Sequence, residues 1–173
     1  MDADKEKHAE QELHKKLAKG YRDLREKDRN SAYYDKVWID TMFRLLEKNS
    51  INGREPKEVL DFGCGGGALL LKMLKLGLDA KGIEKHKGLF QLAQDRLKEA
   101  GFNKEKIIQG SIKELDGFAK SSFDFVVLMG VFQYLSRQQR TQLYKKIHKL
   151  LKPNGHMVGT FQNAFFDLFT FNK

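Results

Sequence analysis

The chain has 173 residues, of which 40% are hydrophobic, and it carries one cysteine and a formal net charge of +9. This length suits one domain with a packed core, and the single cysteine excludes an internal disulfide and a cysteine-rich zinc site. The longest apolar stretch, 123–135, is shorter than a membrane span and is interrupted by Asp124 and Gln133. We therefore expect a cytoplasmic domain with no membrane partner, and the scattered histidines predict no metal site.

Two helices are predicted before the first strand. Residues 2–29 are dense in charge, and their few apolar residues recur every three or four positions, which predicts a solvated amphipathic helix. A second helix is expected to begin near Asn30 or Ser31, either of which can cap it. This helix has a wide apolar face with polar aromatic groups. The aromatic members of that face are Tyr33, Tyr34, Trp38 and Phe43.

A glycine-rich motif at 59–67 reads Val-Leu-Asp-Phe-Gly-Cys-Gly-Gly-Gly and precedes an apolar-periodic segment at 68–76. This order predicts a strand, a tight turn and a helix whose positive end faces a bound ligand. Glycines let that ligand lie against backbone N–H groups. The spacing differs from the G-x-G-x-x-G of dinucleotide-binding proteins, and Asp61 would repel a pyrophosphate but attract a cationic group. Cys64, inside the turn, is interpreted as a small filler residue rather than a nucleophile.

Glu84 ends a second strand predicted at 79–84. It follows the glycine turn by about 20 residues, the spacing at which a carboxylate accepts hydrogen bonds from both hydroxyls of a ribose. A helix at 86–101 and a third strand at 106–110 are predicted next, and Ser111 follows directly. The sequence therefore indicates that Glu84 binds the sugar of a nucleoside-containing cofactor.

The continuous apolar run at 123–129 predicts a fourth strand that is buried on both faces. In an open α/β sheet the ends of the first and fourth strands face each other where ligands bind, so reactive groups are expected at 130–134. Gln133 and Tyr134 are the catalytic candidates there. Neither is a ready base at neutral pH, because glutamine does not titrate and tyrosine has a pKa of about 10.

A basic segment at 137–152 has six lysines and arginines and no acidic residue, but apolar residues recur in it at helical spacing. We interpret it as the solvated face of a packed helix, while a nucleic-acid surface stays open as an alternative. Pro153, Asn154 and Gly155 are expected to stop the helix and turn into a fifth strand at 156–161.

Exposure of the phenylalanine-rich tail at 162–173 to water would be unfavourable. The tail packs over the edge of the fifth strand, or a partner covers it, or the chain is a fragment of a longer enzyme. We favour the fragment. An oligomer formed through this C-terminal edge stays open as a further hypothesis.

Four features in this order resemble class I S-adenosylmethionine-dependent methyltransferases: Asp61 with the glycine turn, Glu84, the 123–129 strand with its loop, and the Leu-Lys-Pro-Asn-Gly turn at 151–155. The resemblance covers roughly residues 33–161. It implies an α/β fold with a doubly wound, mostly parallel Rossmann-like sheet and helices on both faces, here lacking the final C-terminal strands. It divides the chain into an N-terminal helical arm and lid, 1–50, and a cofactor-binding core, 51–173.

The resemblance implies S-adenosylmethionine as the cofactor. In related enzymes an acid after the third strand binds the adenine amino group, and here Ser111 takes its place. The helices before the glycine motif cap the site in similar enzymes, so Tyr34 is expected near the cofactor, although core packing explains it equally well. The cofactor-binding residues that we expect are Asp61, Gly63, Gly65, Gly67, Glu84, Ser111, Ile112, Met129 and Tyr34.

The first functional hypothesis is methyl transfer to a small molecule. Related small-molecule enzymes often carry Glu-His where this chain has Gln133-Tyr134, which favours an amine, thiol or activated carbon as the acceptor atom. Methyl transfer can proceed without a base when such an atom is aligned with the sulfonium. The alternatives are an RNA methyltransferase that uses the basic helix at 137–152, and a non-catalytic scaffold that keeps the fold.

Overall fold

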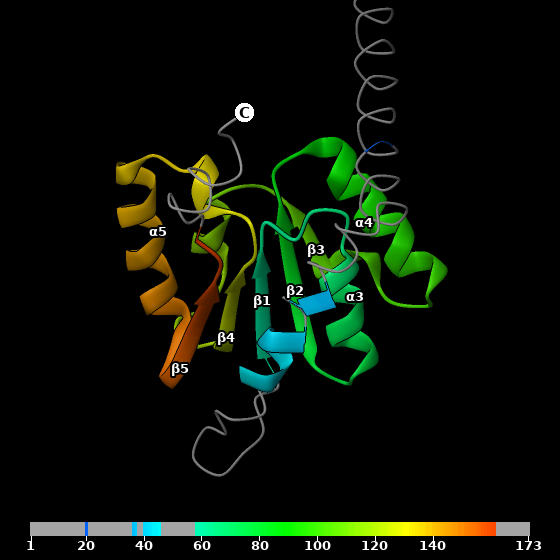
Figure 1. Ribbon diagram of the computed structural model, residues 1–173, viewed down its shortest axis with the longest axis horizontal. Helices are drawn as coiled ribbons and strands as arrows, with labels where there is room; N and C mark the ends of the chain where they lie inside the picture. Colours follow the sequence, from blue (N-terminus) through cyan, green and yellow to red (C-terminus); the bar gives the residue numbers. More distant parts are fainter. Residues whose placement is uncertain (1–19, 21–35, 38–39, 46–57, 162–173) are drawn as a thin grey trace, which may run out of the picture.

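The computed structural model describes residues 20, 36–37, 40–45 and 58–161 (Figure 1). Within these residues a five-stranded parallel sheet has the order β3-β2-β1-β4-β5. The strands are β1 (Glu58–Phe62), β2 (Asp79–Glu84), β3 (Ile107–Gln109), β4 (Phe123–Leu128) and β5 (Leu151–Gly159). The helices are α3 (Ala68–Lys75), α4 (Lys87–Glu99) and α5 (Arg137–Leu150), with short 3₁₀ turns η1 (Lys104–Lys106), η2 (Glu114–Gly117) and η3 (Phe132–Tyr134).

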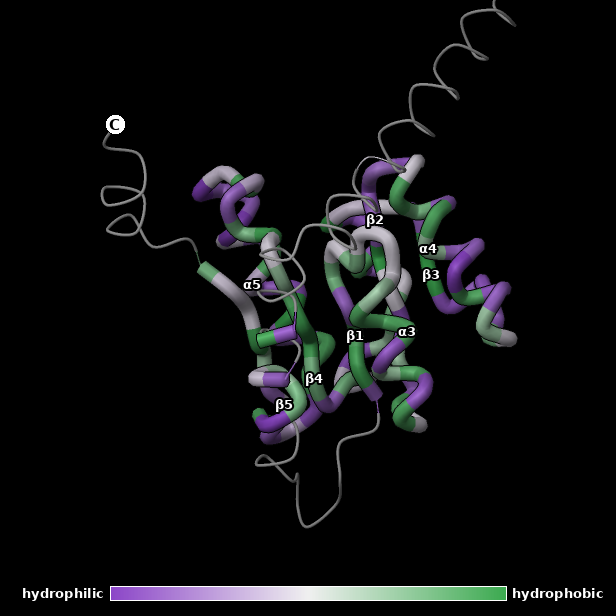
Figure 2. Tube along the Cα trace, turned by 45° about the vertical axis from the view of Figure 1, so that its right-hand side comes forward, coloured by the Kyte–Doolittle hydropathy of each residue, from purple (hydrophilic) through white to green (hydrophobic). Residues whose placement is uncertain are grey.

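Helices cover both faces of the sheet, as predicted. Successive residues of β4 point to opposite faces: Val127 belongs to one core cluster and Val126 to the other. The first cluster includes Leu70 of α3 and Leu97 of α4, and the second includes Leu143 of α5. Figures 1 and 2 show α3 and α4 on one side of the molecule and α5 on the other, with hydrophobic residues concentrated along the strands between them. The doubly wound fold is confirmed.

The direction of winding changes at β1, which pairs with β2 on one side and with β4 on the other. The chain moves from β1 outward to β2 and β3, then crosses back to β4 and β5. Ligands bind such sheets at the carboxyl ends of the strands beside this point. The glycine turn, which we define as residues 63–67, follows β1 directly and therefore lies at that position.

The start of β5 differs from the prediction. The helix expected at 137–152 ends at Leu150, and the expected turn is a bulge inside β5. Leu151 lies opposite Phe123 and His156 opposite Phe125, so the intervening residues loop out of register. Lys152 explains why this segment stays on the sheet, because its Nζ lies 2.7 Å from a carboxylate oxygen of Glu58 in β1 and 3.0 Å from one of Asp124 in β4.

Part of the predicted second helix packs on the α3 side of the sheet. Residues 36–37 and 40–45 are helical, and Met42 is buried in the first core cluster. Asp40 forms an ion pair with Lys72 of α3 at 3.4 Å. Tyr33, Tyr34, Trp38 and, apart from Gly20, the helix predicted at 2–29 lie outside the described residues, so the lid role stays a prediction. No described helix is long and apolar enough to span a bilayer.

Candidate cofactor site

The glycine turn requires glycine at two of its positions. Gly63 and Gly67 have φ of 77° and 75°, in the left-handed region. A Cβ on Gly63 would lie 2.6 Å from Cγ2 of Val131, and one on Gly67 would lie 2.9 Å from Cβ of Ala93. The turn is therefore packed between α4 and the loop that follows β4, and a side chain at Gly63 or Gly67 would not fit there.

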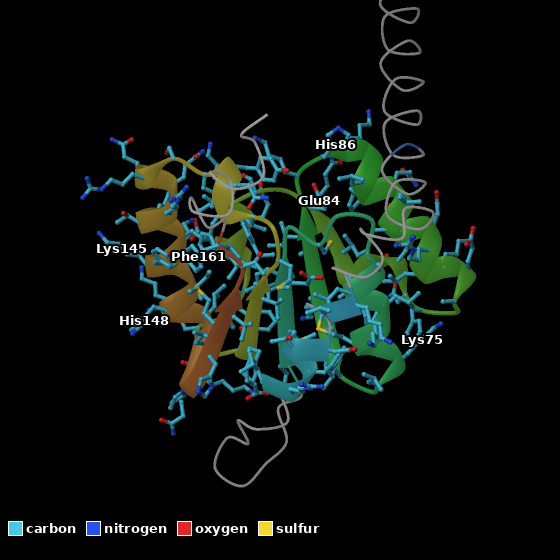
Figure 3. All side chains as sticks on the ribbon, in the orientation of Figure 1. Lys75, Glu84, His86, Lys145, His148 and Phe161 are labelled. Carbon is cyan, nitrogen blue, oxygen red and sulfur yellow. The ribbon has the colours of Figure 1, made fainter. Side chains whose placement is uncertain are left out.

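Glu84 joins the glycine turn to the start of α4. Its carboxylate is 8% exposed and accepts hydrogen bonds from the N–H of Gly65 at 2.9 Å and from the N–H of His86 at 2.6 Å. His86 caps α4, and Figure 3 shows both side chains at the carboxyl edge of the sheet. A carboxylate has about four acceptor sites, so each oxygen can accept one more hydrogen bond. Glu84 can thus accept hydrogen bonds from a ligand while it keeps its hydrogen bond to the turn.

Asp61 is a second buried carboxyl group, at the end of the adjacent strand β1. It is 2% exposed, and no hydrogen bond joins its side chain to another residue that the structure describes. Burial, and then the nearby Glu84, raise the pKa of Asp61 to about 7. A buried carboxylate without a donor is costly, and a cation placed beside it would remove most of that cost. The electrostatics of the site therefore favour a cationic ligand.

Cys64 has no features of a nucleophile. Burial, followed by the charges of Asp61 and Glu84, raises the pKa of its thiol well above the ordinary value, so the group is protonated at neutral pH. Its Sγ would lie 2.8 Å from a Cβ on Gly82, which places it against β2. The interpretation of Cys64 as a small filler residue agrees with this packing.

The end of β3 carries a carboxylate that the sequence analysis missed. Glu114 accepts a hydrogen bond from the N–H of Ser111 at 2.5 Å, and this bond is the main reason that the pKa of Glu114 is lowered. The Glu114 carboxylate lies directly over Gly110, where a Cβ would come within 2.7 Å of Oε2. A local signal was available, because Ser-x-x-Glu is a capping-box pattern. Ile112, expected beside the cofactor, is buried in the second core cluster.

The loop after β4 touches the glycine turn through Val131 rather than through either catalytic candidate. Gln133 is exposed, and Tyr134 is 81% exposed. Gly130 donates its N–H to Oγ1 of Thr160 at 2.7 Å, which ties the loop to the end of β5, a contact that no local pattern predicted. Met129 packs against the first core cluster. The structure thus brings Asp61, the turn and Glu84 together, while the side chain of Tyr134 is largely exposed to solvent.

A family model described as a methyltransferase domain matches residues 59–155. The mitochondrial ubiquinone biosynthesis O-methyltransferase of Schizosaccharomyces pombe is 30% identical over 134 residues, which cover 75% of this chain and 44% of that protein. The tRNA(Thr) (cytosine(32)-N(3))-methyltransferase of Saccharomyces cerevisiae is 27% identical over 146 residues, 76% of this chain and 22% of that protein.

Solved structures show the same fold. A crystal structure of a protein from Pyrococcus horikoshii has a TM-score of 0.70 and 21% identity, and covers 90% of this chain and 70% of that one. The chain spans about half the length of the curated relatives it matches. The family model covers more than half of the chain, from β1 into β5. This chain therefore belongs to the class I S-adenosylmethionine-dependent methyltransferases, and residues 59–155 lie in its methyltransferase domain.

Proposed function

We propose that this chain binds S-adenosylmethionine along the carboxyl ends of β1, β2 and β3 and transfers its methyl group to a small molecule held at the loop after β4. The observation that carries the proposal is the pair of buried carboxyl groups, Asp61 and Glu84, beside a turn that has no room for a side chain at Gly63 or Gly67. An anionic cofactor would be repelled by this pair, whereas a cofactor with an ammonium and a sulfonium group would be attracted.

The residues of the site fit this cofactor. Asp61 has a buried carboxyl group that lacks a described hydrogen-bond donor, which an ammonium group can supply. Glu84 has acceptor capacity left for two ribose hydroxyls. The sheet order places the end of β3 next to that of β2, and we therefore assign the base to the side of Ser111 and Glu114. The three strand ends thus offer one acidic or acceptor group to each part of the cofactor.

The residues divide the work of methyl transfer between binding and alignment. S-adenosylmethionine supplies an electrophilic methyl group on its sulfonium. Asp61, Glu84 and the turn hold the cofactor in one orientation, and Val131 keeps the acceptor loop against the turn. Residues 130–134 contain no acid, histidine or lysine, so an acceptor atom that is already nucleophilic is favoured. Alignment of that atom, rather than removal of its proton, is the contribution of the protein.

A second candidate acceptor is RNA, and the surface of α5 favours it. Arg137, Lys145 and Lys149 are exposed on this helix, which contains no acidic residue, and Figure 3 shows Lys145 on its outer side. In contrast, Lys146 is paired with Asp116 at 2.5 Å. RNA binding through these cations would weaken steeply as salt is raised, because each phosphate contact releases counterions.

Calorimetric titration with S-adenosylhomocysteine tests the cofactor part of the proposal. This product keeps the ammonium group, the ribose and the adenine, and lacks the methyl group and the positive charge of the sulfonium, so we expect micromolar binding. No binding to a chain shown to be folded would overturn the proposal and favour a scaffold role. Incubation with methyl-labelled S-adenosylmethionine and a cell extract, followed by separation of RNA from low-molecular-mass compounds, then distinguishes the two acceptor classes.

A further inference from the structure

Arg96 in α4 reaches back to the glycine turn. Its Nη1 donates a hydrogen bond to the backbone carbonyl of Gly66 at 2.8 Å, across a separation of 30 residues in the chain. The side chain is partly buried, and its guanidinium is always charged. A charge-assisted hydrogen bond of this kind is about twice as strong as one between neutral groups. Nothing in the sequence motif itself indicates this contact.

The turn needs such a support because it contains three consecutive glycines. Glycine loses more conformational freedom on ordering than any other residue. Hydrogen bonds fix the N–H of Gly65 to Glu84 and the N–H of Gly67 to the carbonyl of Cys64, the latter at 3.0 Å. The bond from Arg96 fixes the peptide group between Gly66 and Gly67 from its carbonyl side. The peptide groups Cys64–Gly65 and Gly66–Gly67 are thereby held.

The same helix also forms the wall behind the turn. A Cβ on Gly66 would lie 3.0 Å from Cδ2 of Leu92, and one on Gly67 would lie 2.9 Å from Cβ of Ala93. Leu92, Ala93 and Arg96 are neighbours on one face of α4. The turn therefore rests on this face, and Arg96 supplies its polar anchor.

Arg96 adds a second connection between α4 and the glycine turn. Glu84 accepts hydrogen bonds from Gly65 in the turn and from His86 at the start of α4. At the other end of α4, Arg96 bonds back to Gly66 in the same turn. The helix is thus tied to the turn from both of its ends, and a shift of the turn would disturb the position of the Glu84 carboxylate.

We propose that Arg96 is a positioning residue for the cofactor, which holds the glycine turn and Glu84 in their binding arrangement before the cofactor arrives. This inference rests on the proposed function, because it concerns the same site. Arg96 acts through the turn and does not touch the cofactor. Its contribution is preorganisation: without it, part of the binding free energy is used to order the glycines.

The test compares Arg96→Ala, Arg96→Lys and a control, Lys98→Ala, which removes an exposed cation from the same helical turn. Affinity for S-adenosylhomocysteine is measured by calorimetry, and hydrogen exchange is measured in the peptide that covers the glycine turn. We expect Arg96→Ala to weaken binding about tenfold, the loss of one charge-assisted hydrogen bond. Arg96→Lys should recover part of the affinity because its ammonium retains a donor, and Lys98→Ala should bind like the wild type.

Hydrogen exchange separates positioning from general destabilisation. In Arg96→Ala, exchange should accelerate in the glycine turn but not in β4, and saturating ligand should restore the protection. If Arg96→Ala does not fold, Arg96→Lys is compared with the wild type by the same two measurements. Unchanged affinity and exchange in a folded variant would overturn the role of Arg96 alone. Failure of the wild type to bind would overturn the proposed function and this inference together.

Discussion

We predict that replacing Asp61 by Asn stabilises the free protein at pH 8 and weakens its binding of S-adenosylhomocysteine. The carboxyl group is buried beside Glu84, and together burial and that charge raise its pKa from 3.8 to about 7. The folded protein therefore keeps the proton on Asp61 over a range of pH in which the unfolded chain has lost it. Asparagine has the same shape but never ionises, so it avoids the cost of a buried charge.

The size and sign of the effect follow from this difference in pKa. At about 1.4 kcal/mol for each pKa unit, the difference corresponds to about 4 kcal/mol, which is an upper scale for the cost of ionising Asp61 in the folded state. Because the folded-state pKa is raised, the contribution of Asp61 to stability is highest below pH 3.8, falls as pH rises toward 7 and levels off above it. The free energy of unfolding of Asp61→Asn should therefore exceed that of the wild type most clearly at pH 8, and only slightly at pH 4.

Urea unfolding at several pH values measures this difference, with Asp95→Asn as the control because Asp95 is exposed on α4. The gain in unfolding free energy from Asp61→Asn should grow from pH 4 to pH 8, while Asp95→Asn should show no such growth. A gain that is independent of pH would refute the reasoning, since it would mean that Asp61 does not change its ionisation in this range.

The affinity for the ligand should rise with pH, whereas the contribution of Asp61 to stability falls with pH. The ammonium group of S-adenosylhomocysteine attracts the ionised form of Asp61, so the proton competes with it below pH 7. Wild-type affinity should fall between pH 8 and pH 6, and Asp61→Asn should bind weakly at both. Calorimetry in two buffers of different ionisation enthalpy should detect a proton released on binding near pH 7. Equal affinity of the two proteins at pH 8 would refute the assignment of Asp61 to the cationic end.

The remaining predictions concern Glu84 and Gly63. Glu84→Ala removes the proposed acceptor of the ribose hydroxyls and leaves the part-buried N–H groups of the turn and of His86 without their acceptor, so calorimetry should show binding of S-adenosylhomocysteine weakened by more than tenfold. The exposed Glu99→Ala should have no effect, and equal losses would contradict the assignment of Glu84. Gly63→Ala meets both a left-handed φ and the Val131 side chain, whereas Gly77→Ala meets only the left-handed φ. Urea unfolding should therefore show a greater loss of stability for Gly63→Ala, by about 1–3 kcal/mol, and equal losses would argue against close packing of the two loops.

Much of the fold could be predicted because its signals are local. The second strand was predicted at 79–84, and β2 spans those residues. Gly77 and Gly101 follow α3 and α4 with left-handed φ, the conformation for which glycine is the usual residue at a helix end. Asp61 and Glu84 lie at adjacent strand ends because the strands of a doubly wound parallel sheet have their carboxyl ends at one edge.

The contacts that hold the loops could not be predicted in the same way. Arg96 with Gly66, and Thr160 with Gly130, join residues 30 apart in the chain through the tertiary structure. The bulge in β5 also depends on distant residues, because the ion pairs of Lys152 keep a segment on the sheet that its Pro-Asn-Gly sequence would place in a free turn. Local patterns show where a turn begins but not which distant side chain fixes it.

The distribution of charge bears on where the proposed cofactor and methyl acceptor would bind. The chain is strongly basic overall, yet Asp61 and Glu84 lie at the ends of β1 and β2, and Glu114 follows β3 in η2. On the other side of the winding point, the loop after β4 has no acid and leads into the basic helix α5. A cationic cofactor is therefore favoured on the first side, and an acceptor that carries an anionic group is favoured on the second. The positive charge on α5 would then attract the acceptor from this side, whether the acceptor is a small anionic molecule or RNA.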